Sequence, residues 1–194
     1  MLIMKINKRD RISKLFVDIA KDIIVNEGVQ NVSVRKIADE AGYSYATIYN
    51  YYDDLNSLLW SVKKELIQEL IVHMGNNPSK NLNDIKQLFH RYIAYYINYP
   101  NVFKFFYFYP LDISTDDIEH EFNFSLMWNK TFSEIMDEYQ LNISDIQVIS
   151  KCLIYSIHGL LMLHFSQNGS TNMKTICSDV DQIIDYLINR KGDL

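Results

Sequence analysis

The side chains best suited to recognising another molecule lie between Tyr45 and Tyr51. This segment carries hydroxyl groups, one amide and aromatic rings, and the first carboxylate after it belongs to Asp53. Hydroxyl and amide groups can bond phosphates and base edges, and a segment without acids does not repel a phosphate backbone. The segment therefore favours contact with nucleic acid, whereas a solvated surface helix would normally carry Glu and Lys.

Two short predicted helices around a tight turn position this segment. Ser33 is expected to cap the first helix, because its hydroxyl can accept a hydrogen bond from a free backbone N–H. Gly42 can end that helix in the left-handed conformation, and Ser44 can cap the second helix, about 45–51. The apolar stripe of the first helix consists of Val34, Ile37, Ala38 and Ala41. A unit of this size can place its second helix in the major groove of DNA.

The side chains of the second helix divide into two sets. Those expected to face inward are Ile48 and Tyr52, and those expected to face outward are Tyr45, Thr47, Asn50 and Tyr51. The alternative is two ordinary core helices joined by a glycine turn, with tyrosines on the surface. The cap, the glycine, the short second helix and the acid-free face agree in register, which favours the helix-turn-helix.

Several short segments between Ile12 and Leu59 occur in a distinctive combination. They are the apolar residues Ile12, Phe16, Ile19 and Ala20 before Asn26-Glu27-Gly28, then Ser33-Val34-Arg35-Lys36-Ile37-Ala38, the turn Ala41-Gly42-Tyr43-Ser44, the run Ala46-Thr47-Ile48-Tyr49-Asn50-Tyr51-Tyr52, and Leu58-Leu59. On these residues, the stretch 12–62 resembles the DNA-binding domain of the TetR family of transcriptional regulators. The resemblance covers roughly a quarter of the chain.

By position, the resemblance implies which residues contact DNA. They are Ser33, Val34, Arg35, Tyr45, Ala46, Thr47, Tyr49, Asn50 and Tyr51. We expect Tyr49 and Tyr51 to donate to phosphates through their phenols, and Thr47 to meet a phosphate or a base. Tyr45 and Asn50 are better suited to reading base edges, since an Asn amide can form two hydrogen bonds with adenine. Arg35 suits a phosphate or a guanine.

One position departs from the family pattern. Many members carry a lysine near the start of the fourth helix, as a usual phosphate contact, where this chain has Leu55 after Asp53 and Asp54. The two aspartates would repel a phosphate backbone. We therefore expect residues 53–56 to cap the fourth helix and to anchor phosphate only weakly.

The charge of the chain is unevenly distributed. The net charge is −5, but residues 1–50 carry 8 basic and 6 acidic side chains, and residues 51–194 carry 11 and 18. The basic side chains gather at Lys5, Lys8, Arg9, Arg11 and Lys14. A short arm there could follow a phosphate backbone while the acidic remainder faces away. Because the basic excess is small, we expect tight binding to need two copies of the domain.

The rest of the chain also has a helical pattern. No convincing alternation of period two appears, and the predicted helices lie at about 58–74, 82–98, 100–109, 115–139, 145–166 and 173–189. The expected fold is all-α with about nine helices: an N-terminal three-helix helix-turn-helix domain, residues 1–57, and a C-terminal helical effector-binding and dimerisation domain, residues 58–194. The boundary falls near Trp60, inside the fourth helix, so one rigid helix could carry a shift from one domain to the other.

The last two predicted helices, about 145–166 and 173–189, are the candidates for dimerisation. The first has an unusually wide apolar band of Ile146, Ile149, Leu153, Ile157, Leu160, Leu161 and Leu163. The second has a stripe of Ile176, Val180, Ile183, Ile184 and Leu187. Gly159 would allow a close approach of two helices; the alternative is that the band is simply core within one chain. The resemblance implies a four-helix bundle between two subunits, and a two-fold dimer predicts a palindromic operator.

The resemblance also implies a small-molecule effector held among the middle helices. Candidate pocket residues are aromatic or can offer a polar point: His90, Tyr92, Phe106, Tyr109, Phe124, Trp128 and His158. Apolar walls with a few polar groups suit such a pocket. Taken singly, each of these residues is more often part of a core or a surface.

The sequence gives no sign of catalysis, a cofactor or a metal site. It has no Gly-x-Ser-x-Gly and no paired histidines at metal spacing, and Cys152 and Cys177 are expected to be buried thiols. No apolar run is long enough for a membrane span, and the first residues lack a secretory segment, so we expect a cytoplasmic protein. The favoured function is a homodimeric repressor released from its operator by an effector. The alternative is a helical dimer of the same fold that acts mainly through effector or protein binding, with weak or no operator specificity.

Overall fold

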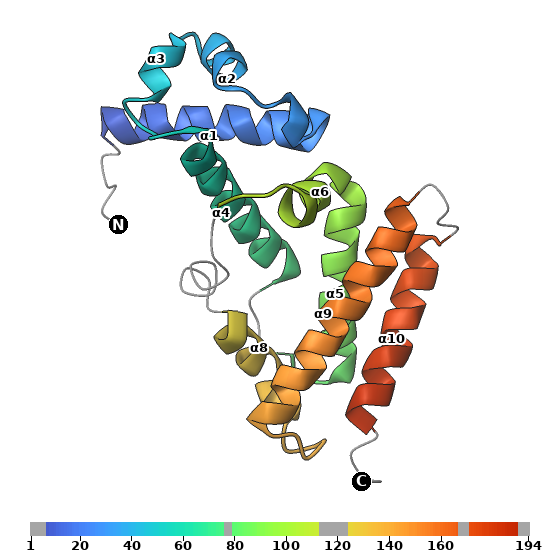
Figure 1. Cartoon of the computed structure of the whole chain (residues 1–194). Helices are drawn as coiled ribbons and strands as arrows, with labels where there is room; N and C mark the ends of the chain where they lie inside the picture. The colour runs from blue at the N-terminus through green and yellow to red at the C-terminus, as the bar shows by residue number, and fades with distance from the viewer. Residues whose placement is uncertain (1–6, 76–78, 113–123, 167–170, 190–194) are drawn as a thin grey trace. The chain divides into compact units, whose positions relative to one another are not determined.

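The computed structural model describes residues 7–75, 79–112, 124–166 and 171–189, without the side chains of residues 124–126 (Figure 1). Within these ranges the chain forms helices and no strand, which confirms the all-α prediction. The α-helices are α1 Lys8–Glu27, α2 Val34–Ala41, α3 Tyr45–Ile48, α4 Leu55–Met74, α5 Leu82–Asn98, α6 Pro100–Phe108, α8 Phe124–Phe132, α9 Ile143–Phe165 and α10 Met173–Asn189. The 3₁₀ helices are η1 Val29–Asn31 and η2 Ser133–Ile135.

The chain forms two compact units. The N-terminal unit consists of residues 1–69 and 99–113, and the C-terminal unit consists of residues 70–98 and 114–194. The expected division at residues 57 and 58 stays a prediction, because this grouping adds most of α4 and all of α6 to the N-terminal helices. Helix α4 runs without a break from one unit into the other.

The N-terminal unit is organised around α1. The helix begins after Asn7, whose side chain accepts a hydrogen bond from the backbone N–H of Asp10, and it ends at Gly28, where φ is +92°. Its buried side chains recur at helical spacing, and α2, α3 and α4 add further apolar side chains to the same core. The buried residues are Phe16, Val17, Ala20, Ile23, Ile24, Ile37, Ala38, Ile48, Leu58, Leu59 and Val62.

Helix α6 packs in the N-terminal unit although it follows α5 in the sequence. Pro100 stands at its first turn, and the run of aromatics that follows is helical, as predicted. The Asn101 side chain donates to the Val25 carbonyl of α1 at 3.1 Å, and Lys63 Nζ of α4 lies 3.4 Å from the Phe106 carbonyl. Burial lowers the pKa of Lys63, whose ammonium also lies over the Phe106 ring. These contacts join α6 to both α1 and α4.

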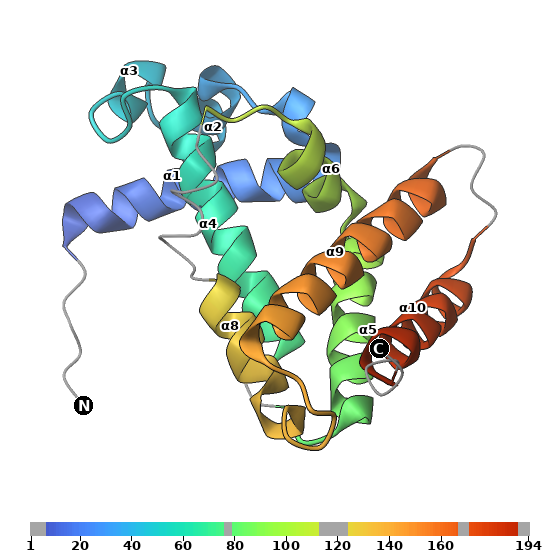
Figure 2. The same ribbon diagram turned by 60° about the horizontal axis from the view of Figure 1, so that its bottom comes forward.

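The C-terminal unit is built from α5, α8, α9 and α10. Helix α10 packs on α5 and α9, and α8 packs on α9; Figures 1 and 2 show these four helices from two directions. Two polar contacts connect α5 to α10: an ion pair of Lys86 with Asp185 at 2.7 Å, and a hydrogen bond between His90 Nε2 and Asp181 at 2.8 Å. Helix α9 begins at a capping box, in which Asn142 and Asp145 each bond the other's backbone N–H.

The predicted helix at 115–139 is wrong in the part that the structure describes. Helix α8 ends at Phe132, and the chain continues through η2 into a turn in which Gln140 has a φ of +52°. The Ser133 hydroxyl donates to the Lys130 carbonyl at 2.8 Å, so a side chain competes for a carbonyl of the last α-helical turn. Residues 115–123 lie outside the described ranges.

Helix α9 carries two apolar stripes. The first is buried within the chain and consists of Ile146, Ile149, Leu153, Ile157 and Leu161. These residues were part of the band that the sequence offered to a partner, so that assignment is wrong for them. The second stripe, here called the exposed seam, consists of Val148, Cys152, Tyr155, Gly159 and Met162. Its spacing of four and three residues is that of a helix-pairing seam, and Tyr155 is 71% exposed.

Of the helices in the described ranges, only α9 is long and apolar enough to span a membrane. Length and composition are weak evidence, because a core helix of a soluble protein passes the same test. The buried stripe of α9 packs against other helices of its own unit. This packing accounts for the apolar character of that face without a lipid environment.

The turn after α2 yields the first prediction. Gly42 has a φ of +72°, and a Cβ added there would meet nothing within 4 Å. Gly42→Ala should therefore lower the free energy of unfolding by about 1–2 kcal/mol through backbone strain alone. Gly42→Asn should cost less, because Asn tolerates the left-handed conformation. Chemical denaturation measures both variants, and equal losses for Ala and Asn would contradict the backbone explanation.

Candidate nucleic-acid interface

Helix α2 and the turn after it have the local structure that the sequence predicts. Ser33 caps α2, accepting from the Lys36 backbone N–H at 3.2 Å. Gly42 is left-handed, and its N–H donates to carbonyls of the last turn of α2. The next N–H, of Tyr43, donates to the Ala38 carbonyl at 2.9 Å. Capping groups thus satisfy both ends of α2 and fix the direction in which the chain enters α3.

Helix α3 is shorter than the predicted 45–51. It ends at Ile48, and residues 49–51 form a turn in which the Asn50 N–H donates to the Thr47 carbonyl at 3.1 Å. Ser44 stands at the N-cap, but its hydroxyl pairs with the Thr47 hydroxyl at 2.9 Å and makes no capping bond to the backbone. The shorter helix follows from bonds that span three residues, which tighten the chain and close the α-helical pattern.

The residues of this segment differ in exposure. Tyr45 is 59% exposed and Tyr49 is 51% exposed, and Ala46 and Asn50 are exposed beside them, whereas Thr47 is half-buried. On α2 and its cap, Ser33 and Arg35 are exposed and Val34 is half-buried. Ile48 is buried, as predicted.

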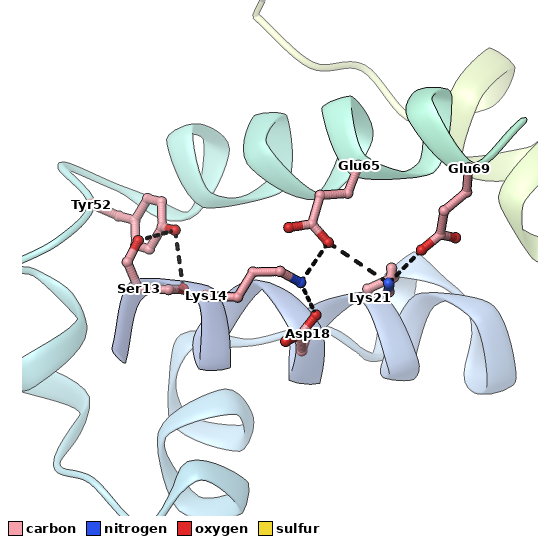
Figure 3. Close-up of polar contacts among 7 residues, drawn as sticks. All are labelled: Ser13, Lys14, Asp18, Lys21, Tyr52, Glu65 and Glu69. Carbon is pink, nitrogen blue, oxygen red and sulfur yellow. Dashed lines mark hydrogen bonds and ion pairs between the residues drawn. The ribbon is translucent and has the colours of Figure 1, made fainter. Parts of the chain in front are cut away.

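Tyr51 and Tyr52 pack toward α1. The Tyr51 ring meets the edge of the Phe16 ring at 5.6 Å and is half-buried. The Tyr52 hydroxyl lies 2.7 Å from Ser13 Oγ and 3.3 Å from the Ser13 carbonyl (Figure 3). Phe16 also contacts Tyr43 edge-on. Both ends of α3 are therefore attached to α1 through aromatic rings, and a phosphate contact by Tyr51 stays a prediction.

The basic side chains of α1 have two different environments. Lys14 pairs with Asp18 and with Glu65 at 3.0 Å, and Lys21 pairs with Glu69 of α4 at 2.6 Å (Figure 3). Burial opposes the change, but hydrogen bonds to the two carboxylates raise the pKa of Lys14. Lys14 thus serves the joint between α1 and α4, contrary to its expected place in the phosphate-binding arm.

The remaining basic residues lie near the start of α1. Lys8, Arg9 and Arg11 are exposed, and Lys5 lies outside the described residues. Arg9 Nη2 donates to the Asn50 carbonyl at 3.1 Å, and the guanidinium lies 5.8 Å from the centre of the Tyr51 ring. This contact joins the basic arm to the segment after α3.

The start of α4 agrees with the expected cap. The Asp54 carboxylate accepts from the Ser57 N–H at 2.7 Å, and the Ser57 hydroxyl contacts the Asp54 N–H in return. Leu55, at the position where the resemblance led us to expect lysine, begins the helix and is half-buried. The carboxylate satisfies a free N–H of the first turn, which explains an acid at this place.

Comparison with known proteins agrees with this geometry. Residues 16–62 match the family model described as bacterial regulatory proteins, tetR family. Residues 16–62 therefore form a DNA-binding domain of the TetR type. The match extends from Phe16 in α1 to Val62 in α4, so it includes α2, the Gly42 turn and α3. No curated protein matches the chain.

The family assignment makes the chain a DNA-binding transcriptional regulator. In this TetR-family protein, α2 with α3 forms the helix-turn-helix, and the outward side chains of α3 are the candidates for base contact. The match ends at Val62, so it includes no part of the C-terminal unit.

The expected pocket residues do not form one group. Phe106 and Tyr109 belong to the N-terminal unit, and the side chain of Phe124 lies outside the described residues. In the C-terminal unit, Tyr92 and His158 share a hydrogen bond of 2.6 Å with their rings stacked. Trp128 stacks on Phe89 with ring centres 5.6 Å apart, and His90 pairs with Asp181. The structure therefore brings Tyr92 and His158 together, and an effector pocket stays a prediction.

The cysteines and the acids give no metal site in the part of the chain that is described. No group of three or more His, Cys, Asp or Glu there could hold a metal ion. Cys152 is exposed and Cys177 is half-buried, so the expectation of two buried thiols is wrong for Cys152. Cys152 lies in the exposed seam of α9, whose apolar residues explain why composition suggested burial.

Sequence reasoning missed Arg9 and Ser13 as partners of the segment after α3. Arg9, Ser13 and Phe16 follow one another at intervals of four and three residues, so they lie on one face of α1. Each contacts a residue between Tyr43 and Tyr52. The spacing was visible in the sequence, but nothing in it indicated which segment this face would meet.

His158 yields a prediction on pH dependence. Burial lowers the pKa of His158 from 6.5 to about 4. Between these values the unfolded chain binds a proton that the folded chain does not, so the free energy of unfolding should fall as the pH drops. His158→Gln should remove up to about 3 kcal/mol of that fall, since one pKa unit is worth about 1.4 kcal/mol. Chemical denaturation across this pH range measures it, and parallel profiles of both proteins would contradict the prediction.

Proposed function

We propose that this TetR-family protein is a homodimeric repressor that binds a palindromic operator and is released by a small-molecule effector. The observation that carries the proposal is the exposed, acid-free face of Tyr45, Tyr49 and Asn50 on a helix-turn-helix matched by the family model. Hydroxyl and amide groups on such a face suit phosphates and base edges. Since DNA is its ligand, we place the protein in the cytoplasm.

The proposed contacts have separate roles. Tyr49 and Tyr51 donate to phosphates through their phenols, Thr47 meets a phosphate or a base, and Tyr45 and Asn50 read base edges. The N-terminus of α2 offers Ser33, Val34 and Arg35 to the backbone, with Ala46 in apolar contact. Helix N-termini favour phosphate because their N–H groups and dipole point toward the anion.

The proposed dimer forms through α9 and α10. Its support is the exposed seam of α9, which leaves Val148, Tyr155 and Met162 in contact with water in the single chain. A contiguous apolar surface of this kind marks an interaction site more often than ordinary surface. A Cβ on Gly159 would meet nothing within 4 Å, so this point of the seam leaves room for a partner helix. Tyr186 adds an exposed aromatic ring on α10.

The proposed effector acts through the C-terminal unit. Tyr92, His158 and Trp128 supply aromatic surface and neutral polar groups of the kind that small-molecule sites use. Helix α4 extends from the C-terminal unit into the N-terminal unit, so it offers a continuous element for coupling. Binding that favours one position of α4 would change the operator affinity.

A second candidate function is a helical dimer of this fold with weak or no operator specificity. Leu55 in place of a lysine, and Asp53 and Asp54 before it, favour this alternative because they weaken phosphate anchoring. Since the Asp54 carboxylate is engaged in capping α4, its repulsion of a phosphate is reduced. We therefore favour the repressor.

Binding to DNA from upstream of the protein's own gene tests the proposal. Fluorescence anisotropy over a range of salt concentrations should give a steep log–log slope, because several phosphates are neutralised per dimer. Tyr49→Phe should lower the affinity for every sequence, whereas Asn50→Ala should change the sequence preference, by about 1–3 kcal/mol at one base position. A slope near zero would favour the second candidate. If both variants weaken all duplexes equally, the assigned roles are wrong.

The dimer is tested separately by substitution in the exposed seam. Tyr155→Arg places a charge in the seam and should convert the dimer to monomers, because an unpaired buried charge is costly. Ile143→Arg is the matched control: Ile143 is an exposed apolar residue of α9 that lies outside the seam. Sedimentation velocity measures the oligomeric state of both. A dimeric Tyr155→Arg protein, or monomers from both variants, would contradict this interface.

A further inference from the structure

One face of α1 holds the chain that follows α3. Arg9 contacts Asn50 and Tyr51, Ser13 contacts Tyr52, and Phe16 contacts Tyr51. Figure 3 shows Ser13 below the Tyr52 hydroxyl, with both bonds drawn. The three side chains recur at helical spacing on α1, so a single rigid helix supports three consecutive residues, 50–52, of the segment after α3.

This support matters because α3 is only four residues long. Tyr45–Ile48 amounts to about one helical turn, which has no stability of its own in water. Asn50 comes after the end of the helix, where its carbonyl has no following turn to bond. The Asn50 N–H is held within the segment by the Thr47 carbonyl, whereas the Asn50 carbonyl is held from outside it, by Arg9.

Arg9 makes the contact nearest to Asn50. Its Nη2 donates to the Asn50 carbonyl at 3.1 Å, while the same guanidinium lies 5.8 Å from the Tyr51 ring centre. A planar guanidinium can donate at its edge and lie against an aromatic ring with its face, which an ammonium cannot do at once. One side chain thus restrains the backbone of Asn50 and the ring next to it.

We propose that Arg9 is a positioning residue for base recognition by Asn50, and that it contributes to sequence preference without touching a base. The inference rests on the proposed function. A two-bond contact between an amide and adenine requires the side chain within about 0.5 Å of its productive position. Loss of the Arg9 contact leaves the backbone carbonyl of Asn50 unrestrained. The side-chain amide of Asn50 then samples positions that suit the correct base less well.

The competing explanation is that Arg9 is only a phosphate-binding cation of the basic arm. A phosphate contact weakens binding to all sequences alike and reduces the salt slope. A positioning contact lowers the ratio of specific to nonspecific affinity. A double-mutant cycle with Asn50→Ala separates the two, because residues that act through one another are not additive.

The experiment uses the full chain and two duplexes of equal length. One is the sequence that the wild-type protein selects from a randomised pool, and the other is its scrambled counterpart. Arg9→Ala should lower the affinity ratio roughly fivefold, the effect of losing one hydrogen bond of ordinary strength. In the Asn50→Ala background, Arg9→Ala should lower the ratio no further. Arg9→Lys, which keeps the charge, should also have a lower affinity ratio than the wild-type protein.

Arg11→Ala is the matched control, because Arg11 is an exposed arginine two positions along α1. It should weaken both duplexes alike and leave the ratio in place. Unchanged far-UV circular dichroism and sedimentation of Arg9→Ala exclude misfolding, and Arg9→Lys carries the test if that variant is unstable.

Three results would overturn the inference. Arg9→Ala could weaken binding to both duplexes equally. Its effect on the affinity ratio could be the same in the Asn50→Ala background as in the wild-type protein, or Arg9→Lys could behave as wild type. Each of these leaves the proposed function intact and reduces Arg9 to a phosphate contact. If the wild-type protein selects no sequence at all, the proposed function fails and the inference fails with it.

Discussion

The packing of aromatic rings from residues 43–52, the segment that contains α3, against α1 is the interaction on which the N-terminal unit depends. Phe16 lies between Tyr43, which precedes α3, and Tyr51, which follows it. A helix of one turn gains too little from its own hydrogen bonds to persist alone, so its shape comes from these tertiary contacts. The exposed face of α3 is available for recognition because the opposite side, at Ile48, is buried in the same core.

Charge is distributed in accordance with this arrangement. Lysines in the middle of α1 pair with glutamates of α4, so they hold the two helices together and contribute little to the positive potential that a polyanion would meet. Exposed pairs of this kind contribute about 0–1 kcal/mol each, and their main effect is to set how α1 and α4 align. The cations of α1 that are left for a polyanion stand at its beginning, next to the segment after α3, and Arg35 of α2 is exposed as well. A single N-terminal unit therefore offers few cations to phosphate, which supports the proposed dimer.

Local signals in the sequence predicted local structure well. Ser33, Gly42 and the Asp54 region form the expected caps and turn, because each depends on residues within one helical turn. Helices α5 and α10 have the predicted bounds, since proline, glycine and asparagine interrupt the pattern on either side. The end of α3 was predicted wrongly because residues 49–51 contain no helix-breaking residue, and the turn there combines hydrogen bonds that span three residues with contacts to α1.

Contacts between segments that are distant along the chain could not be predicted from the sequence. Arg9 and Asn50 are 41 positions apart, and nothing in their types connects them. The stripe of α9 that faces its own chain could not be chosen from composition, because the helix is apolar on two sides. The place of α6 beside α1 likewise depends on single side chains such as Asn101. Caps and periodicity are encoded locally, whereas these pairings are decided by the whole core.

The exposed seam of α9 affects the fate of a newly synthesised chain. If the proposed dimer forms, a single copy exposes this apolar seam to water, and it therefore stays prone to aggregation and proteolysis until a second copy binds. Survival of the folded molecule then rises with its own abundance, by mass action. Cells that make very little of this protein would lose a disproportionate share of the folded molecules. The change from unregulated to regulated transcription would then be sharper than the rate of synthesis alone suggests.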